Sequence, residues 1–322
     1  MLDIARIEAD AQPMSLEPVR VETVIREAID MVRPLALARG VWVGEVPHPA
    51  AERYVRADRQ RLTQVLLNLL SNAVKYNRPS GAVRIGYEPA RDASGEERLR
   101  IRVTDEGTGI AAEQRDQLFV PFARLGAEHT GVEGTGLGLA LSQRLARAMD
   151  GTLFLERTGA DGSAFCVDLR PTASPLADVP ALAARAERGT GAPHAAATLL
   201  YVEDNLANLS LVETILLPRP EWRLVPALQG RLGLELALEH APDVVLLDLH
   251  LPDIPGRELL RLLRADARTA HTPVVVISAD ATPRTIETLL GEGADAFLTK
   301  PLDVRAFLAT VERLLARAAR PA

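Results

Sequence analysis

Two segments in the first half of the chain repeat apolar side chains at the three-to-four-residue spacing of an amphipathic helix. Residues 21–39 form the first segment, and Gly40 follows it where a left-handed glycine commonly ends a helix. Residues 64–76 form the second segment, and Asp58 stands ahead of it as a candidate N-cap. The pattern therefore predicts two helices with defined ends.

Other segments of this half alternate apolar and polar side chains, which is typical of half-buried strands. Alternation over residues 83–87 and again over 99–103, with the polar stretch ARDASGEE between them, predicts a hairpin. This half is therefore expected to be an α+β domain. The same reasoning predicts a helix over 139–149 that ends at Gly151, and further strands around Leu153 and over 165–169.

From Thr198 the pattern changes to apolar runs that alternate with amphipathic segments. The runs are LLYVED, RLVPAL, VVLLDL, VVVIS and AFLTK. Continuous apolar strands separated by helices predict an α/β doubly wound, five-stranded parallel sheet over 198–322. Residues 172–197, rich in Pro, Ala and Gly, are expected to be a linker after a domain over 15–171. Residues 1–14 carry helical spacing without a cap and are expected to be the end of a longer helix.

Composition narrows the class of protein. A chain of 322 residues with 47% hydrophobic and 25% charged residues is long enough for two globular domains. A net charge of −6 with mixed signs gives no basic surface for nucleic acid, so protein partners are expected. The single cysteine, Cys166, cannot form an internal disulfide and is interpreted as a small buried hydrophobe in a reducing compartment. No apolar run reaches the ~18 residues of a membrane span, so a cytoplasmic location is expected.

An asparagine pair and a glycine turn carry the first candidate chemistry. Asn68 and Asn72 lie one turn apart in QVLLNLLSNAVKY, so both amides leave the same helix face. Asparagine is unfavourable inside helices, although two satisfied polar groups on a solvated face are the alternative interpretation. Asp105 ends a predicted strand before Gly107 and Gly109, which allow a tight turn against a flat ligand. Its carboxylate can accept the exocyclic amine of adenine.

A second glycine loop opens the predicted helix at 139–149. Backbone N–H groups at a helix N-terminus, together with the helix dipole, favour phosphate binding. The spacing differs from the lysine-bearing pattern of P-loop enzymes, so the loop indicates phosphate binding only in combination with the other motifs. The order of the asparagine pair, the Asp105 turn and this glycine loop predicts an ATP site. The loop residues are Gly134, Thr135, which can add a hydroxyl, Gly136, Leu137 and Gly138.

Polar side chains stand at the carboxyl ends of four predicted strands in the second half: Glu203, Asp204, Asp248, Ser278 and Lys300. Open α/β sheets bind ligands at this edge. Three neighbouring carboxylates would repel one another without a divalent cation, and an all-oxygen site suits Mg²⁺. Asp248 can then attack a phosphoryl group, with Lys300 neutralising charge and Ser278 hydrogen-bonding the transferred oxygens.

Four segments of the first half resemble the catalytic ATP-binding domain of bacterial sensor histidine kinases. QVLLNLLSNAVKYN, DEGTGI, LFVPFARL and EGTGLGLAL are similar to its N, G1, F and G2 boxes, in the same order. The wider superfamily includes gyrase, the large heat-shock chaperone and MutL. The resemblance covers residues 1 to about 170. It implies the α+β sandwich of the histidine kinase and gyrase ATPases.

The resemblance also implies roles for individual residues. Gyrase-like ATPases carry a glutamate general base where Asn68 stands, so Asn68 favours phosphoryl transfer to protein over hydrolysis. The aromatic pair at 119 and 122 would hinge a lid over 124–133, although simple core packing is the alternative. The implied roles are Mg²⁺ coordination by Asn72, proximity of Asn68 to the triphosphate waters, phosphate contacts from Lys75, Tyr76 and Arg124, and adenine recognition by Asp105.

The second half resembles the response-regulator receiver domain, a flavodoxin-like fold, over its whole length. VEDN, LLDLHLPDIPG, VISAD and FLTKP carry the resemblance. It implies that Asp248 is phosphorylated and that Glu203, Asp204 and the backbone carbonyl of His250 bind the metal. It further implies a rotamer-switching aromatic at Phe297 and a cis peptide bond before Pro301.

One part of the kinase pattern has no match. None of the six histidines stands in the His-Glu-x-x-x-Pro setting of a phosphoacceptor helix. MLDIARIEAD resembles the last turns of the second helix of the dimerisation and phosphotransfer hairpin. The acceptor helix is therefore expected to be missing, the chain to be partial, and self-phosphorylation on histidine to be absent.

The leading hypothesis is the C-terminal part of a hybrid sensor histidine kinase that uses ATP and Mg²⁺. Its expected partners are a histidine-containing phosphotransfer hairpin or protein, a downstream response regulator or phosphotransfer protein, and a second copy through the hairpin. The alternative is a non-kinase module that binds nucleotide, with the receiver acting as a docking partner or phosphate sink. A gyrase-like hydrolase is disfavoured by Asn68.

Overall fold

The computed structural model describes residues 14–46, 52–123, 135–175 and 196–318. The chain divides into two compact units. Of the described residues, the first unit comprises those within 18–174, and the second comprises 14–17, 175 and 196–318. The predicted helix end at 1–14 and most of the predicted linker lie outside the described residues. The linker was expected to begin at 172, whereas Thr172 still belongs to a strand.

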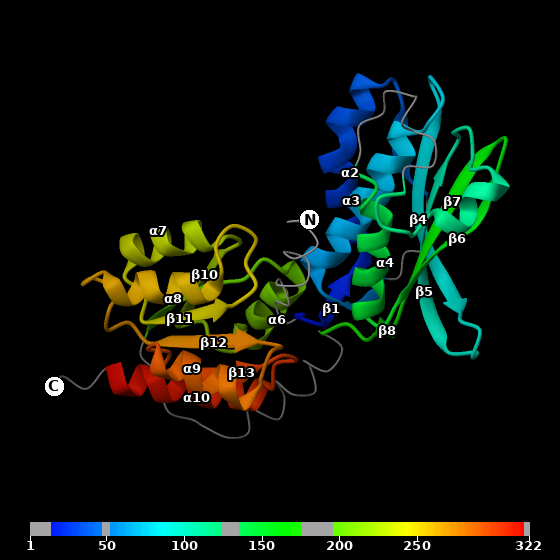
Figure 1. Cartoon of the computed structure of the whole chain (residues 1–322). Helices are drawn as coiled ribbons and strands as arrows, with labels where there is room; N and C mark the ends of the chain where they lie inside the picture. The colour runs from blue at the N-terminus through cyan, green and yellow to red at the C-terminus, as the bar shows by residue number, and fades with distance from the viewer. Residues whose placement is uncertain (1–13, 47–51, 124–134, 176–195, 319–322) are drawn as a thin grey trace. The chain divides into compact units, whose positions relative to one another are not determined.

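The first unit is an α+β sandwich in which helices cover one face of a five-stranded sheet (Figure 1). The sheet order is β2-β4-β5-β7-β6, with β4, β5, β7 and β6 antiparallel and β2 parallel to β4. Strands β1, β3 and β8 form a separate small sheet. The elements are β1 (Glu17–Arg20), α2 (Val21–Ala38), β2 (Trp42–Glu45), β3 (Tyr54–Ala57), α3 (Arg59–Lys75), β4 (Ala82–Arg91), β5 (Glu97–Asp105), the 3-10 helix η1 (Ala112–Gln117), α4 (Gly138–Ala148), β6 (Thr152–Gly159), β7 (Gly162–Leu169) and β8 (Pro171–Thr172).

The helix ends follow local chemistry. Asp58 caps α3 as predicted, because its carboxylate accepts a hydrogen bond from Arg61 N at 3.0 Å. Gly40 follows α2 with φ +62°, the left-handed conformation expected of it. The helix predicted over 139–149 ends at Ala148, before Gly151 as expected, and the left-handed residue after it is Asp150 at φ +57°. Gly151 is small for another reason: a Cβ there would lie 2.5 Å from the carbonyl oxygen of Asp168.

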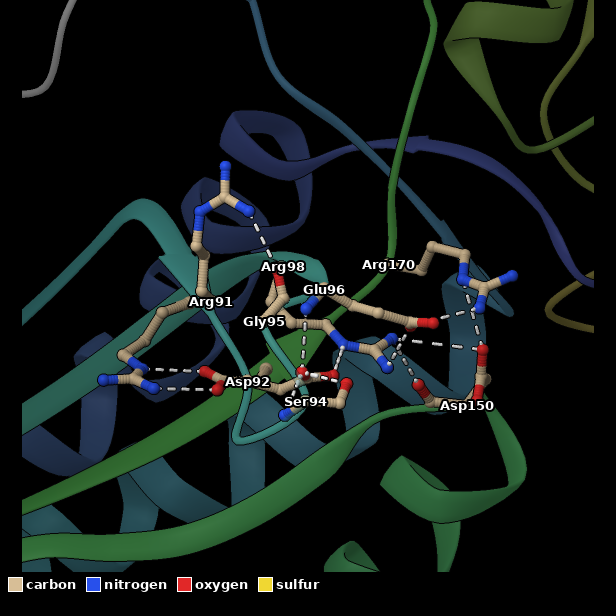
Figure 2. A network of polar contacts seen from close by, with 10 residues as sticks. Arg91, Asp92, Ser94, Gly95, Glu96, Arg98, Asp150 and Arg170 are labelled. Atoms are coloured by element: carbon tan, nitrogen blue, oxygen red, sulfur yellow. Dashed lines mark hydrogen bonds and ion pairs between the residues drawn. The ribbon is translucent and has the colours of Figure 1, made fainter.

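A polar network closes the turn between β4 and β5 (Figure 2). Asp92 accepts hydrogen bonds from Ser94 Oγ at 2.6 Å and from Arg98 Nε at 2.9 Å. Arg98 also donates to the carbonyl oxygen of Asp150 at 3.2 Å, and Asp150 pairs with Arg170. The Ser94 hydrogen bond is the largest cause that lowers the pKa of Asp92 to about 2. The network therefore ties the hairpin turn to the segment after α4.

The second unit is the predicted doubly wound sheet, with five parallel strands in the order β10-β9-β11-β12-β13. One hydrophobic cluster packs α6 and α10 on one face, and a second packs α7, α8 and α9 on the other. The elements are β9 (Ala197–Val202), α6 (Leu206–Leu216), β10 (Trp222–Ala227), α7 (Gly230–His240), β11 (Val244–Asp248), α8 (Gly256–Ala265), β12 (Val274–Ser278), α9 (Pro283–Gly291), β13 (Ala296–Thr299) and α10 (Val304–Ala318).

Two predictions from composition can be compared with the structure. Cys166 is fully buried in β7, as expected of a small packing residue, and burial raises the pKa of its thiol to about 12. Among the described helices, none combines the length and apolar character that a bilayer span requires.

Candidate functional sites

Helix α3 and the start of α4 bring the asparagine pair beside the glycine loop. Asn68 and Asn72 are both half-buried on α3. Asn68 Nδ2 donates to Ser142 Oγ of α4 at 2.9 Å. A Cβ added at Gly138 would overlap the amide oxygen of Asn68, so a larger residue there would displace the Asn68 side chain. Two segments about seventy residues apart in the chain therefore meet at the predicted triphosphate position.

Asp105 lies at the end of β5 and is 8% exposed. Its Oδ1 accepts hydrogen bonds from Gly107 N at 2.8 Å and from Ser163 N at 3.1 Å, while Oδ2 takes part in neither bond. Burial raises the pKa of Asp105, and the two backbone N–H donors oppose that rise. A Cβ at Gly107 would overlap the carbonyl oxygen of Tyr76 at the end of α3. The turn thus holds one carboxylate oxygen in place and packs directly against the asparagine helix.

The glycine loop also contacts the segment that holds the two phenylalanines. Gly136 has φ +70°, and its carbonyl accepts a hydrogen bond from Phe122 N at 3.0 Å. A Cβ at Gly136 would lie 2.7 Å from the carbonyl carbon of Phe122. Phe122 is itself left-handed, at φ +66°, and 54% exposed, so the core-packing alternative is wrong for this side chain. It stands next to the predicted lid at 124–133.

Other predicted nucleotide-site residues lie at the end of α3 and just before α4. Lys75 lies in the last turn of α3, half-buried, and Tyr76 follows it, exposed. Thr135 is exposed and Leu137 is the residue before α4. Arg124, Gly134 and the predicted lid lie outside the described residues. Ser163, which donates to Asp105, was not predicted from the sequence, because only the pairing of β5 with β7 brings the two residues together.

The second site gathers buried charges at the carboxyl ends of the parallel strands. Glu203 and Asp204 follow β9, and Asp248 ends β11. All three are buried, and each offers a carboxylate oxygen within 4.8 Å of the others. Lys300 Nζ lies 2.9 Å from Glu203 Oε2 and 3.0 Å from Asp248 Oδ2. The prediction that strand ends bring these side chains together is therefore confirmed by the geometry.

Burial sets the electrostatics of this site. Burial is the largest cause that raises the pKa of Glu203, to about 8, with Lys300 opposing the rise and Asp248 adding to it. Burial alone would lower the pKa of Lys300, but the surrounding carboxylates, Asp248 first, raise it well above its usual value. Lys300 is therefore a cation held among acids. Besides the three carboxylates, the buried Glu17 also pairs with Lys300, with its Oε2 2.9 Å from Lys300 Nζ. Four buried acids against one cation retain excess negative charge, which fits a divalent metal with oxygen ligands.

Neighbouring groups complete the acidic site. Ser278 ends β12 fully buried, and its Oγ accepts a hydrogen bond from Asp280 N at 3.2 Å. His250 N donates to Asp248 Oδ1 at 3.3 Å. The cis peptide bond expected before Pro301 is present. Tyr201 was missed from the sequence, although it stands two residues before Glu203 and therefore on the same side of β9; its hydroxyl donates to Glu203 Oε2 at 2.8 Å.

Comparison with protein families finds two matches that follow the two units. Residues 57–173 match the family described as histidine kinase-, DNA gyrase B- and HSP90-like ATPases. Residues 199–312 match the response regulator receiver domain. Both matches agree with the resemblances in the sequence, and the observed sheets agree with the folds they implied.

Curated relatives align along nearly the whole chain. The virulence sensor protein BvgS of Bordetella bronchiseptica is 34% identical over 336 residues, which cover 100% of this chain and 26% of BvgS. The sensory/regulatory protein RpfC of Xanthomonas campestris pv. campestris is 30% identical, covering 98% of this chain and 48% of RpfC. The chain thus spans less than half of either relative. A crystal structure of full-length ShkA in complex with AMPPNP covers 97% of this chain and 87% of that one, with 23% identity and a TM-score of 0.45.

Proposed function

Because this chain joins a histidine kinase-, gyrase- and HSP90-like ATPase domain to a response regulator receiver domain, we propose that it acts in phosphorelay signalling. Residues 18–174 bind ATP and transfer its terminal phosphoryl group to a histidine of a phosphoacceptor hairpin. Asp248 then accepts the phosphoryl group from that histidine. The observation that carries the proposal is that one chain holds both sites. In one, Asp248, Lys300, Glu203 and Asp204 are buried together, and in the other Asn68 contacts the glycine loop.

The first step is nucleotide binding. Asp105 keeps Oδ2 for the exocyclic amine of adenine, because its Oδ1 is occupied by two backbone donors. The N-terminus of α4 directs free N–H groups and the positive end of its dipole toward phosphates. Asn72 would hold Mg²⁺, with Lys75 and Tyr76 facing the phosphates. An amide at Asn68 cannot take a proton from water, which favours transfer to protein over hydrolysis.

The second step is phosphoryl transfer to Asp248. A carboxylate oxygen of Asp248 forms a bond to phosphorus while the phosphorus–nitrogen bond to the histidine breaks, and its electron pair stays on the imidazole. Lys300 balances charge on the transferred oxygens, and the Ser278 hydroxyl donates to one of them. Glu203, Asp204 and Asp248, with the carbonyl of His250, would hold Mg²⁺, which neutralises the phosphoryl charge when bound. The resulting acyl phosphate lies on a rigid strand end.

The test supplies the histidine separately. The full chain is mixed with γ-labelled ATP, Mg²⁺ and an isolated histidine hairpin of a hybrid sensor kinase. Acid-labile label is expected on the hairpin first and base-labile label on this chain afterwards, with neither product in Asp105→Asn. Nucleotide binding without any labelling of the hairpin would favour the non-kinase module instead. Steady-state ATP hydrolysis without a hairpin would favour the gyrase-like alternative.

A further inference from the structure

The loop that follows the acceptor strand is closed on itself. Gly256 N donates to the carbonyl oxygen of Leu249 at 2.9 Å, so residues 249–256 form a tight excursion between β11 and α8. A Cβ at Gly256 would overlap the carbonyl oxygen of Asp248. The end of the loop therefore returns to the backbone of the acceptor residue itself.

Asp253, in the middle of this loop, caps a different helix. Its Oδ1 accepts a hydrogen bond from Gly230 N at 2.7 Å, and its Oδ2 accepts one from Arg231 N at 2.8 Å. These are the first two N–H groups of α7. The residue at the N-cap position, Gln229, makes no side-chain capping bond, so a carboxylate more than twenty residues away provides the cap. A charged acceptor at the positive end of a helix dipole makes this contact stronger than a neutral cap.

Helix α7 is in turn fixed to the strand that supplies the other acids. A Cβ at Gly233 of α7 would lie 2.6 Å from the Val202 side chain, which leaves no room between α7 and β9. Val202 immediately precedes Glu203, whose N–H donates to the carbonyl oxygen of Ala227 at 2.9 Å. Ile254, next to Asp253, is buried in the same cluster as Val202. The loop that carries Asp253 and the helix α7 that it caps are therefore both packed against buried side chains.

We propose that Asp253 is a positioning residue of the acidic site. It holds the 249–255 loop against α7, so that the backbone at His250 keeps one position relative to Asp248, Glu203 and Asp204. The inference rests on the proposed function, in which this site binds Mg²⁺ and accepts a phosphoryl group. Without the carboxylate, two N–H groups of α7 lose their cap and the loop gains alternative conformations. Metal affinity then falls because the oxygen ligands are no longer preorganised.

The experiment compares three variants of the full chain with the wild type. Asp253→Ala removes both hydrogen bonds, and Asp253→Asn keeps one carbonyl oxygen that can accept one of them. Asp243→Ala is the matched control, because Asp243 accepts a backbone hydrogen bond from Thr198 N at 2.7 Å at the opposite edge of the same sheet. Mg²⁺ affinity is measured by calorimetry. Acyl phosphate formation is measured with acetyl phosphate as the donor at saturating Mg²⁺, and thermal stability is measured as the melting temperature.

Asp253→Ala is expected to weaken Mg²⁺ binding about tenfold, the lower end of the effect of removing an outer support of a metal site. Asp253→Asn is expected to lie between Asp253→Ala and the wild type. Asp243→Ala is expected to lower the melting temperature while Mg²⁺ affinity stays within about twofold. Asp253→Ala and Asp243→Ala are compared under conditions in which both lose the same melting temperature relative to the wild type. The inference is overturned if Asp253→Ala then binds Mg²⁺ and forms acyl phosphate as well as Asp243→Ala does.

Failure of the underlying function has a different signature. A wild-type chain that binds no Mg²⁺ and forms no acyl phosphate would overturn the proposed function, and this inference with it. A wild-type chain that does both, with Asp253 variants indistinguishable from the control, would overturn the positioning role alone.

Discussion

The two candidate sites are built by different physical means. In the first unit, the site is shaped mainly by backbone, since glycines at 107 and 136 allow backbone approaches that any side chain would block. Its one buried carboxylate, Asp105, is held by backbone N–H donors. In the second unit, shape matters less than charge, because three buried acids and Lys300 crowd one strand edge. The first site is therefore sensitive to added volume, and the second to changes of charge.

The largest effect is expected where the charge is also the reacting group. Asp248→Asn replaces the carboxylate that forms the acyl bond in the proposed mechanism with an amide that is too weak a nucleophile, so base-labile labelling by a small phosphodonor should disappear. The melting transition of the second unit should be retained, which shows that the variant is folded. Labelling that persists in Asp248→Asn would place the phosphoryl group elsewhere and break the assignment.

A large effect on stability is expected from removing the cation. Lys300→Ala leaves Glu203 and Asp248 buried without their partner, and such changes typically cost ~3–5 kcal/mol of unfolding free energy. Chemical denaturation of the full chain should show this loss in the transition of the second unit. Added Mg²⁺ should restore part of it, because the metal replaces the missing positive charge. A loss below ~1 kcal/mol would mean that the charges are not coupled as the geometry indicates.

A smaller, shape-dependent effect is expected in the nucleotide site. In Gly107→Ala the added methyl group meets the Tyr76 carbonyl and pushes the Asp105 turn away from α3. ATP affinity, measured by calorimetry, is expected to fall about tenfold, which is about 1.4 kcal/mol. Gly159→Ala is the control, because a Cβ there meets nothing within 4 Å. Equal affinities in the two variants would contradict a site defined by backbone shape.

The smallest effect concerns an exposed charge and serves as a contrast to the buried ones. The folded-state pKa of Asp92, about 2, lies below its usual value of 3.8, chiefly because of the Ser94 hydrogen bond. Its stabilising contribution is therefore complete above about pH 4 and is lost as pH falls through about 2. Carbon NMR of the Asp92 carboxyl should show this low midpoint, and Ser94→Ala should raise it. An unchanged midpoint in Ser94→Ala would assign the shift to Arg98 instead.

Much of the architecture follows from short stretches of sequence. The period of the apolar positions predicted the hairpin at β4 and β5 and the five strands of the second unit, because side-chain direction repeats with backbone geometry. Asp58 and Gly40 marked helix ends through contacts within a few residues. The acids at the strand ends were predictable as a group because parallel strands point the same way.

The amino-acid sequence alone determined which elements form and which side chains arrive at each strand end, since both depend on neighbours along the chain. Only the tertiary structure decided that Ser163 donates to Asp105, that Phe122 is exposed and left-handed, and that Asp253 caps α7. Each of these depends on strand register or on loops that meet after folding. A hydrogen bond between residues 58 positions apart has no local signal, because its energy exists only once the sheet has paired.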